Sequence, residues 1–301
     1  MKKGGRLLCQ GIQLRYAFIA QHQGLFRISA LCRVLSVSRS GYYEWLSRPL
    51  SEREQKDQAL KVKIKRSHEK GRRVYGTRRI KMDLSKQNET VSRRRISRLM
   101  KEESLSCITR RKFKVTTDSR HNKPVAQNLL DRQFQVEQPN QVYVGDITYI
   151  PTREGWLYLA VFIDLYSRAV VGWSMNKRMQ ASLVTDALTM AVWQRQPRKG
   201  LLVHTDRGSQ YVSASYQGLL HQLGFRCSMS RKGNCWDNAP SESFFHTLKT
   251  ERVHREDFQT REEAKRAIFE YIEVFYNRER LHSTNGYIAP LVFEEPLSKA
   301  A

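Results

Sequence analysis

The chain has 301 residues, a formal net charge of +24 and a pI near 10.1. This length suggests two or three structural units, and the charge favours a polyanionic partner. The five cysteines form no CxxC pair, which argues against a disulfide framework or a cysteine-based zinc site and fits a reducing cytoplasm. The sequence contains no apolar run of about 18 residues, the length that would span a membrane. The basic N-terminus also lacks the apolar stretch of a secretory signal.

The positive charge is concentrated in the first part of the chain. Residues 1–125 hold 32 Lys and Arg against 10 Asp and Glu, whereas residues 126–301 hold 21 against 19. A basic arm joined to a nearly neutral half indicates a nucleic-acid-binding segment attached to a different globular unit. A nucleic-acid partner is therefore favoured over an acidic membrane surface and over the absence of any polyanionic partner.

Residues 1–50 are expected to form an N-terminal helical segment. The stretch from Ile28 to Trp45 predicts two short helices joined by a turn, with Ser36 and Ser38 available to cap the second one. This pattern fits a helix-turn-helix and a plain helical hairpin equally well.

Residues 51–115 form a basic block that predicts a helix-turn-helix-like DNA-binding region. The expected helices cover Glu52–His68, Arg78–Leu84 and Val91–Lys101, and the third presents arginines on nearly all of its polar surface. Because neutralised phosphates release counterions, phosphate contact is favoured over a merely solvated basic face. The candidate DNA contacts are Arg78, Arg79, Arg93, Arg94, Arg95 and Arg98. Residues 116–132 are expected to be a linker.

Residues 133–298 predict a catalytic unit of class α/β. Three closely spaced strands, Gln141–Ile150, Leu157–Tyr166 and Ala169–Met175, predict an antiparallel meander. The elements expected next are, in order, helix Ala181–Gln194, strand Leu201–Asp206, helix Ala214–Leu223, strand Arg226–Met229, helix Ala239–His254 and helix Arg261–Tyr276. Together they give a mixed five-stranded sheet flanked by helices, preceded by an all-α region.

Three carboxylates stand apart from the acids on charged helix faces. Asp146 lies inside an apolar strand, Asp206 ends one, and Glu242 lies in the first turn of a helix that Asn238 can cap. A buried carboxylate needs a partner, and a divalent cation is one such partner. Oxygen ligands suit Mg²⁺ or Mn²⁺, and two ions roughly 3.5–4 Å apart would serve phosphoryl transfer. Asp146, on the central strand, is expected to bridge them.

Four longer stretches resemble a known family. QVYVGDITYI, HTDRGSQY, SRKGNCWDNAPSESFFHTLKTE and YIEVFYNRERLHSTNGYIAP together are similar to the integrase core of the second-reading-frame (OrfB) transposases of the insertion-sequence-three family. The interval of 35 residues between Asp206 and Glu242 agrees with this superfamily. YGTRRIKMDL with VSRRRISRLM resembles its helix-turn-helix segment. The resemblance covers nearly the whole chain and implies an RNase H-like fold within the retroviral-integrase superfamily.

The resemblance assigns roles to individual residues. Asp146, Asp206 and Glu242 match the catalytic, metal-binding triad, and Lys249 matches a basic residue that contacts DNA, although a plain surface lysine is the alternative. His204 and Gln210 flank the second aspartate and are expected to support the site without binding metal. Asp164 is expected to pair with the turn at Ser167 and Arg168. The remaining matches, given a structural or DNA-contacting role, are Asn277, Arg280 and His282. Tyr143 stands where a tryptophan is common.

The implied function is transposition: metal-dependent DNA cleavage and strand transfer at insertion-sequence ends by a polynucleotidyl transferase. A nuclease that hydrolyses without joining and a non-catalytic DNA-binding accessory or regulatory product are the alternatives. The expected partners are terminal inverted repeats, target DNA, a first-reading-frame protein or frameshift fusion, and further copies of the chain on DNA. The expected location is the bacterial cytoplasm, in association with the nucleoid.

Overall fold

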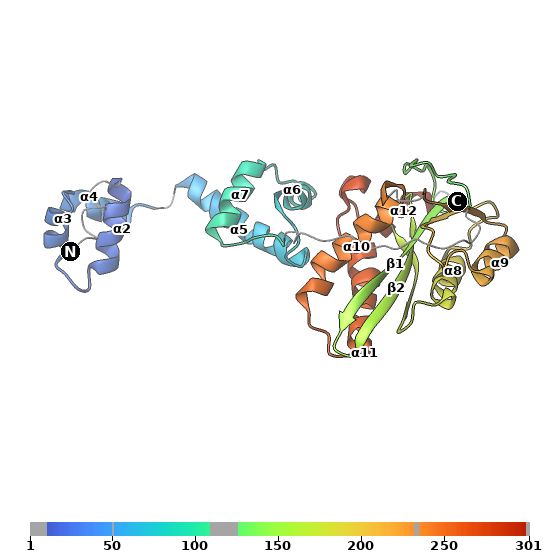
Figure 1. The fold of residues 1–301 in the computed structure, drawn as a ribbon. Helices are drawn as coiled ribbons and strands as arrows, with labels where there is room; N and C mark the ends of the chain where they lie inside the picture. The colour runs from blue at the N-terminus through green and yellow to red at the C-terminus, as the bar shows by residue number, and fades with distance from the viewer. Residues whose placement is uncertain (1–10, 50, 109–125, 232–234, 299–301) are drawn as a thin grey trace. The chain divides into compact units, whose positions relative to one another are not determined.

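The computed structural model describes residues 11–49, 51–108, 126–231 and 235–298 (Figure 1). These residues divide into two compact units, 1–62 and 63–301, so that the boundary falls within helix α5 (Glu52–Lys70). No helix in the described ranges is both long and apolar enough to cross a membrane.

The first unit is a small bundle of helices α2 (Ile12–His22), α3 (Ile28–Val34) and α4 (Arg39–Ser47). Its core includes Tyr16, Ile19 and Tyr42. Ser38 caps α4 by accepting a hydrogen bond of 3.2 Å from the Gly41 amide, whereas Ser36 lies in the turn with φ 52°. Of the two serines expected as caps, only Ser38 makes the contact.

The second unit begins with the basic helices. After α5 come α6 (Thr77–Ser85) and α7 (Arg93–Glu102). Ser92 caps α7 through the Arg95 amide at 3.2 Å. The apolar stripe of α7, which is Ile96, Leu99 and Met100, is buried, and α7 packs against α6. The basic residues of α7 therefore lie on the faces that its stripe leaves outside.

The rest of the second unit is the expected mixed sheet, with strand order β3-β2-β1-β4-β5. The strands are β1 (Val142–Thr152), β2 (Gly155–Asp164), β3 (Val170–Asn176), β4 (Leu202–Thr205) and β5 (Arg226–Met229). The first three form an antiparallel meander, and β4 and β5 run parallel to β1. The predicted α/β fold class is confirmed.

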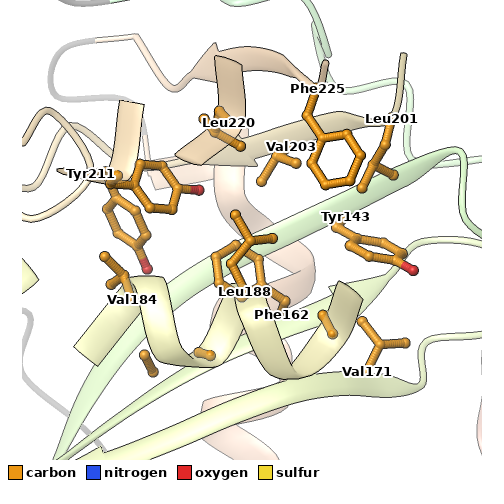
Figure 2. Close-up of a cluster of buried hydrophobic side chains, with 14 of the residues drawn as sticks. Tyr143, Phe162, Val171, Val184, Leu188, Leu201, Val203, Tyr211, Leu220 and Phe225 are labelled. Atoms are coloured by element: carbon orange, nitrogen blue, oxygen red, sulfur yellow. The ribbon is translucent and has the colours of Figure 1, made fainter. Parts of the chain in front are cut away.

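Helices cover both faces of the sheet. The helices are α8 (Ala181–Arg195), α9 (Ala214–Leu223), α10 (Ala239–Glu251), α11 (Arg261–Glu270) and α12 (Pro290–Ser298), with a π-helical turn, η3, over Tyr271–Tyr276. Figure 2 shows the core between α8 and the strands, where α8 contributes Val184 and Leu188 and the sheet contributes Tyr143 and Phe162. Gly145 makes this packing possible, because a Cβ there would lie 2.5 Å from Cε1 of Phe162.

The end of the expected linker belongs to this unit. Residues 116–125 lie outside the described ranges, but the amides of Leu129 and Leu130 donate to the Ser228 hydroxyl at 2.9 and 3.3 Å. Leu130 is buried. The segment from residue 126 to 132 is therefore fastened to β5 and forms part of the catalytic unit.

Candidate active site

The site lies where β1 and β4 separate. These parallel strands pair over Val142–Val144 and Leu202–His204, and continuing the register by two residues aligns Asp146 with Asp206. In parallel sheets, the carboxyl ends of diverging strands are where ligands bind. The polypeptide thus places the first two predicted carboxylates side by side, each half-buried.

Glu242 approaches the same place on helix α10. Pro240 occupies the first turn of α10, and Asn238 precedes it. The predicted side-chain cap at Asn238 is not made. Its amide nitrogen instead donates to the Gly145 carbonyl at 3.4 Å, which ties the start of α10 to the strand next to Asp146. Glu242 itself is exposed in the first turn.

Lys249 comes from the same helix, seven residues further on. Its ammonium lies 4.6 Å from the centre of the Tyr149 ring, a cation–π contact at the far end of β1. Burial lowers the Lys249 pKa, and the attraction of Asp146 opposes that shift. Lys249 is therefore within electrostatic reach of the carboxylates.

The electrostatics of Asp146 show that the three carboxylates converge. Burial raises its pKa well above the usual value, and Asp206 and Glu242 add to the rise. The Ile147 amide, donating at 2.8 Å, and Lys249 act in the opposite direction. Like charges gathered in a partly buried place disfavour ionisation unless a cation joins them.

The donor set fits a hard divalent cation. All three candidate ligands offer carboxylate oxygens, and the buried Tyr211 hydroxyl beside Asp146 and Asp206 has no hydrogen-bond partner within the described parts of the chain. In the described ranges, no three carboxylate, imidazole or thiol groups are already arranged to hold a metal. The chain thus brings the acids to one place without a preassembled cage.

His204 and Gln210 flank Asp206 in different ways. His204 is buried between two hydroxyls, with Nδ1 2.8 Å from Ser228 Oγ and Nε2 3.2 Å from Ser230 Oγ. Burial lowers its pKa to about 4, so the ring is neutral at pH 7. Gln210 donates to the Met179 carbonyl at 3.0 Å. His204 thus joins β4 to β5, and Gln210 ties the loop after Asp206 to the segment before α8.

Asp237, just before α10, was not predicted from the sequence. It is buried and accepts hydrogen bonds from Arg231, Arg132 and Asn128 at 2.8–3.1 Å. The Arg231 guanidinium is the main cause of its strongly lowered pKa. Asp237 therefore fixes the start of the Glu242 helix to the segment that enters the domain. Its only sequence signal is an acid inside an arginine-bearing polar loop.

The C-terminal motif residues have structural contacts. Asn277 exchanges two hydrogen bonds with the backbone of Val170 on β3, at 3.0 and 2.9 Å. Arg280 forms a buried bidentate pair with Glu251 at 2.8 and 2.7 Å.

Asp164, at the end of β2, accepts hydrogen bonds from the amides of Asn140 and Tyr166 at 2.7 and 2.9 Å. Its contact to the expected turn is through its backbone carbonyl, which accepts from the Arg168 amide at 2.8 Å.

His282 provides a test of stability against pH. Burial, helped by Arg280, Arg168 and Arg79, lowers its pKa to about 3, so the folded state keeps it neutral. The unfolded chain takes up this proton below about pH 6.5, so stability that is present at pH 7 is lost as the pH falls. Between pH 7 and 5, we expect His282 to account for a loss on the order of 1–2 kcal/mol.

The measurement is urea unfolding of the wild type and of His282→Gln at both pH values. The variant should lose less stability on acidification than the wild type. His221→Gln, which changes an exposed histidine in the last turn of α9, is the matched control and should keep the wild-type difference. Equal differences in all three proteins would contradict the assignment.

The candidate DNA-binding arginines fall into two groups. Arg78, Arg93, Arg94 and Arg98 are exposed, and Arg95 is half-buried. Arg98 also pairs with Glu102 at 2.6 Å, an exposed contact of small energetic value. Arg79 differs from the others, because its Nε donates to the Leu281 carbonyl at 3.1 Å and its guanidinium lies 4.0 Å from Glu251.

These features define a class of protein. The chain matches the integrase core domain over residues 136–235 and a second integrase core domain description over residues 242–296. Residues 54–113 match an HTH-like domain. The mixed sheet and these matches together describe an RNase H-like integrase core that follows a DNA-binding helical region.

Relatives place the chain more narrowly. It is 45% identical to the transposase InsF of insertion sequence IS3A from Escherichia coli K12, over 93% of this chain and 98% of the relative. It is 48% identical to an uncharacterized 31 kDa protein of insertion element IS600 from Shigella sonnei, over 90% of this chain and all of the relative. The chain belongs to the insertion-sequence-three family of transposases, and its activity is DNA cleavage and strand transfer in transposition.

Retroviral integrases are among the similar solved structures. The catalytic core domain of BIV integrase aligns with 54% of this chain and 99% of its own length, at 17% identity and a TM-score of 0.41. A chain of the simian T-cell lymphotropic virus intasome aligns over 66% of both chains, at 18% identity and a TM-score of 0.41.

Proposed function

We propose that Asp146, Asp206 and Glu242 hold two Mg²⁺ or Mn²⁺ ions for cleavage at the ends of the insertion sequence and for joining of the freed 3′-hydroxyl to target DNA. The observation that carries this proposal is the β1–β4 register, which aligns Asp146 with Asp206, together with the effect of Glu242 on the Asp146 pKa. Bound ions would supply Lewis-acid stabilisation of the attacking and leaving oxygens.

We assign different roles to the carboxylates, to Lys249 and to the arginines. Asp146, on the central strand, would be the ligand that the ions share, and Asp206 and Glu242 would complete the set of carboxylate ligands. Lys249 lies on the α10 face of Glu242 and can contact a phosphate next to the carboxylates. In this arrangement, the exposed arginines of α6 and α7 contact the phosphates of the DNA backbone. Arg79 instead has a structural role, through its contacts with Leu281 and Glu251.

A cleavage and joining assay on duplexes that carry the element ends tests this function. We expect nicked and joined products with Mg²⁺ or Mn²⁺ and none with EDTA. Full activity in EDTA would overturn the metal mechanism. Nicks without joined products would favour the nuclease alternative, and DNA binding without any cleavage would favour the accessory alternative.

The chain is also expected to act with partners. We propose that several copies assemble on the two element ends and that a first-reading-frame protein, or a frameshift fusion with it, contributes further DNA recognition. Adding the first-reading-frame product to the joining assay tests this proposal. An unchanged product yield and an unchanged mass of the protein–DNA complex would speak against it.

A further inference from the structure

A cavity of about 440 Å³ lies within the second unit, where the turn after α5 meets the C-terminal end of α10. Arg72 and Arg73 line it from the turn, and Arg252 and Arg255 line it from the segment after α10. Tyr271 and Phe275 of the π-helical turn form an apolar wall. Segments far apart in the sequence thus contribute four guanidinium groups to one hollow.

The carboxylates beside this cavity are already engaged. Glu251 accepts from Arg280 and from the Tyr271 hydroxyl, the latter at 2.8 Å. Glu270 pairs with Arg72, whose guanidinium also lies 4.4 Å from the centre of the Phe275 ring. Glu69 at the rim is the remaining acid of the lining.

The charges of Arg73 and Arg255 are available to a ligand. Over the described ranges, no ion pair involves Arg73 or Arg255, and both are exposed. The Arg255 guanidinium donates to a backbone carbonyl, that of Glu251, at 3.3 Å. The cavity therefore presents positive charge that the neighbouring acids do not neutralise.

Arg252 supplies an independent sign of a missing acceptor. Its terminal nitrogen pairs with Glu256 at 2.8 Å, but its Nε is buried and has no hydrogen-bond partner among the described residues. A buried donor without a partner costs about 1–3 kcal/mol. An oxygen-rich anion in the cavity would satisfy it.

The backbone of the turn is also held in an unusual conformation. Arg72 and Arg73 are consecutive non-glycine residues with φ of 51° and 65°. Such left-handed residues cost roughly 1–2 kcal/mol each, and strain of this kind gathers at ligand-binding places. The amides of Arg72 and Arg73 hold this turn by donating to the carbonyls of Glu69 and His68 at 2.8 and 2.9 Å.

We propose that this cavity binds a phosphodiester of the DNA backbone, at the junction of the helix-turn-helix-like segment and the catalytic core. The guanidiniums of Arg73, Arg252 and Arg255 hold the phosphate, and the buried rings of Tyr271 and Phe275 form the floor beneath them. The inference rests on the proposed function only in taking duplex DNA as the partner. A phosphate held here fixes the DNA path between the part that recognises the element end and the part that cuts it.

The test is the salt dependence of binding to duplex DNA, measured in EDTA so that no cleavage or metal binding is required. Each phosphate contact contributes about 0.9 to the slope of log K against log salt. Arg73→Ala/Arg255→Ala should lower that slope by about one and weaken binding roughly tenfold near 0.1 M salt. Arg73→Lys/Arg255→Lys keeps the charge and should retain most of the slope.

The matched control removes the same charge elsewhere. Arg198→Ala/Arg226→Ala changes two exposed arginines that do not line the cavity and should leave the slope unchanged. A wild-type slope in Arg73→Ala/Arg255→Ala, or an equal fall in the control, would overturn the proposal. Thermal melting verifies that each variant is folded. If the wild type binds duplex DNA with the expected salt dependence but shows no metal-dependent cleavage, the proposed function is contradicted and this site is not.

Discussion

Replacing Asp146 or Asp206 by Asn, or Glu242 by Gln, is expected to reduce Mg²⁺-dependent cleavage and joining by about three orders of magnitude or more. The amide keeps the size of the side chain but removes the charge that, in the proposed function, would bind the metal. In the proposed function the three carboxylates would act as a unit, so each single variant should lose nearly as much activity as the triple variant. Asp186→Asn, which changes an exposed acid on α8, should keep full activity.

The melting temperature distinguishes Asp146→Asn from a variant that is inactive because it is misfolded. Asp206 and Glu242 disfavour the ionised form of Asp146, so Asp146→Asn should raise the melting temperature of the metal-free protein by a few degrees. Mg²⁺ should raise the melting temperature of the wild type and not that of the variant. A variant that is inactive, melts lower than the wild type and still responds to Mg²⁺ would contradict the role given to Asp146.

The bounds of a helix are predicted correctly where capping residues at both of its ends can be recognised in the sequence. The predicted bounds of α9, Ala214 to Leu223, are confirmed. Its first turn is capped by Ser213, whose hydroxyl accepts from the Tyr216 amide at 3.3 Å, and Gly224 ends it with φ 68°. Local hydrogen bonds and a left-handed glycine act within a few residues, so the sequence carries them directly.

The last two long helices end differently from the prediction because their ends depend on distant partners. The helix expected to reach His254 stops at Glu251, and the helix expected to reach Tyr276 becomes a π-helical turn from Tyr271. The Tyr271 hydroxyl donates to Glu251, 20 residues away. No local pattern encodes a contact across that distance.

The same distinction holds for the site. Asp146 and Asp206 are recognisable because each departs from an apolar strand, and the β1–β4 register then aligns them. Asp237 and Arg79 look like ordinary surface residues in sequence. Their partners Arg132 and Leu281 lie 105 and 202 residues away, so their burial follows only from the assembled fold.

Replacing Arg280 by Met is expected to lower the free energy of unfolding by about 3–5 kcal/mol, because it leaves the Glu251 carboxylate buried without its main countercharge. The side chains of both partners are less than one tenth exposed. Glu251 would retain the Tyr271 hydroxyl at 2.8 Å and the more distant Arg79 guanidinium. Urea unfolding at pH 7 measures the loss.

Removing both charges separates the cost of an unpaired ion from the value of the pair. In Arg280→Met/Glu251→Leu no charge of the pair remains. The Tyr271 hydroxyl and the more distant Arg79 guanidinium lose a partner, so the loss should shrink to about 1–2 kcal/mol. Arg153→Met breaks a pair with Asp257 that is equally well formed but exposed, and it should leave stability unchanged. If the double variant is no more stable than Arg280→Met, the pair itself holds the end of α10 against the C-terminal segment. If it recovers as expected, apolar packing is sufficient there, and the pair instead specifies how α10 meets that segment.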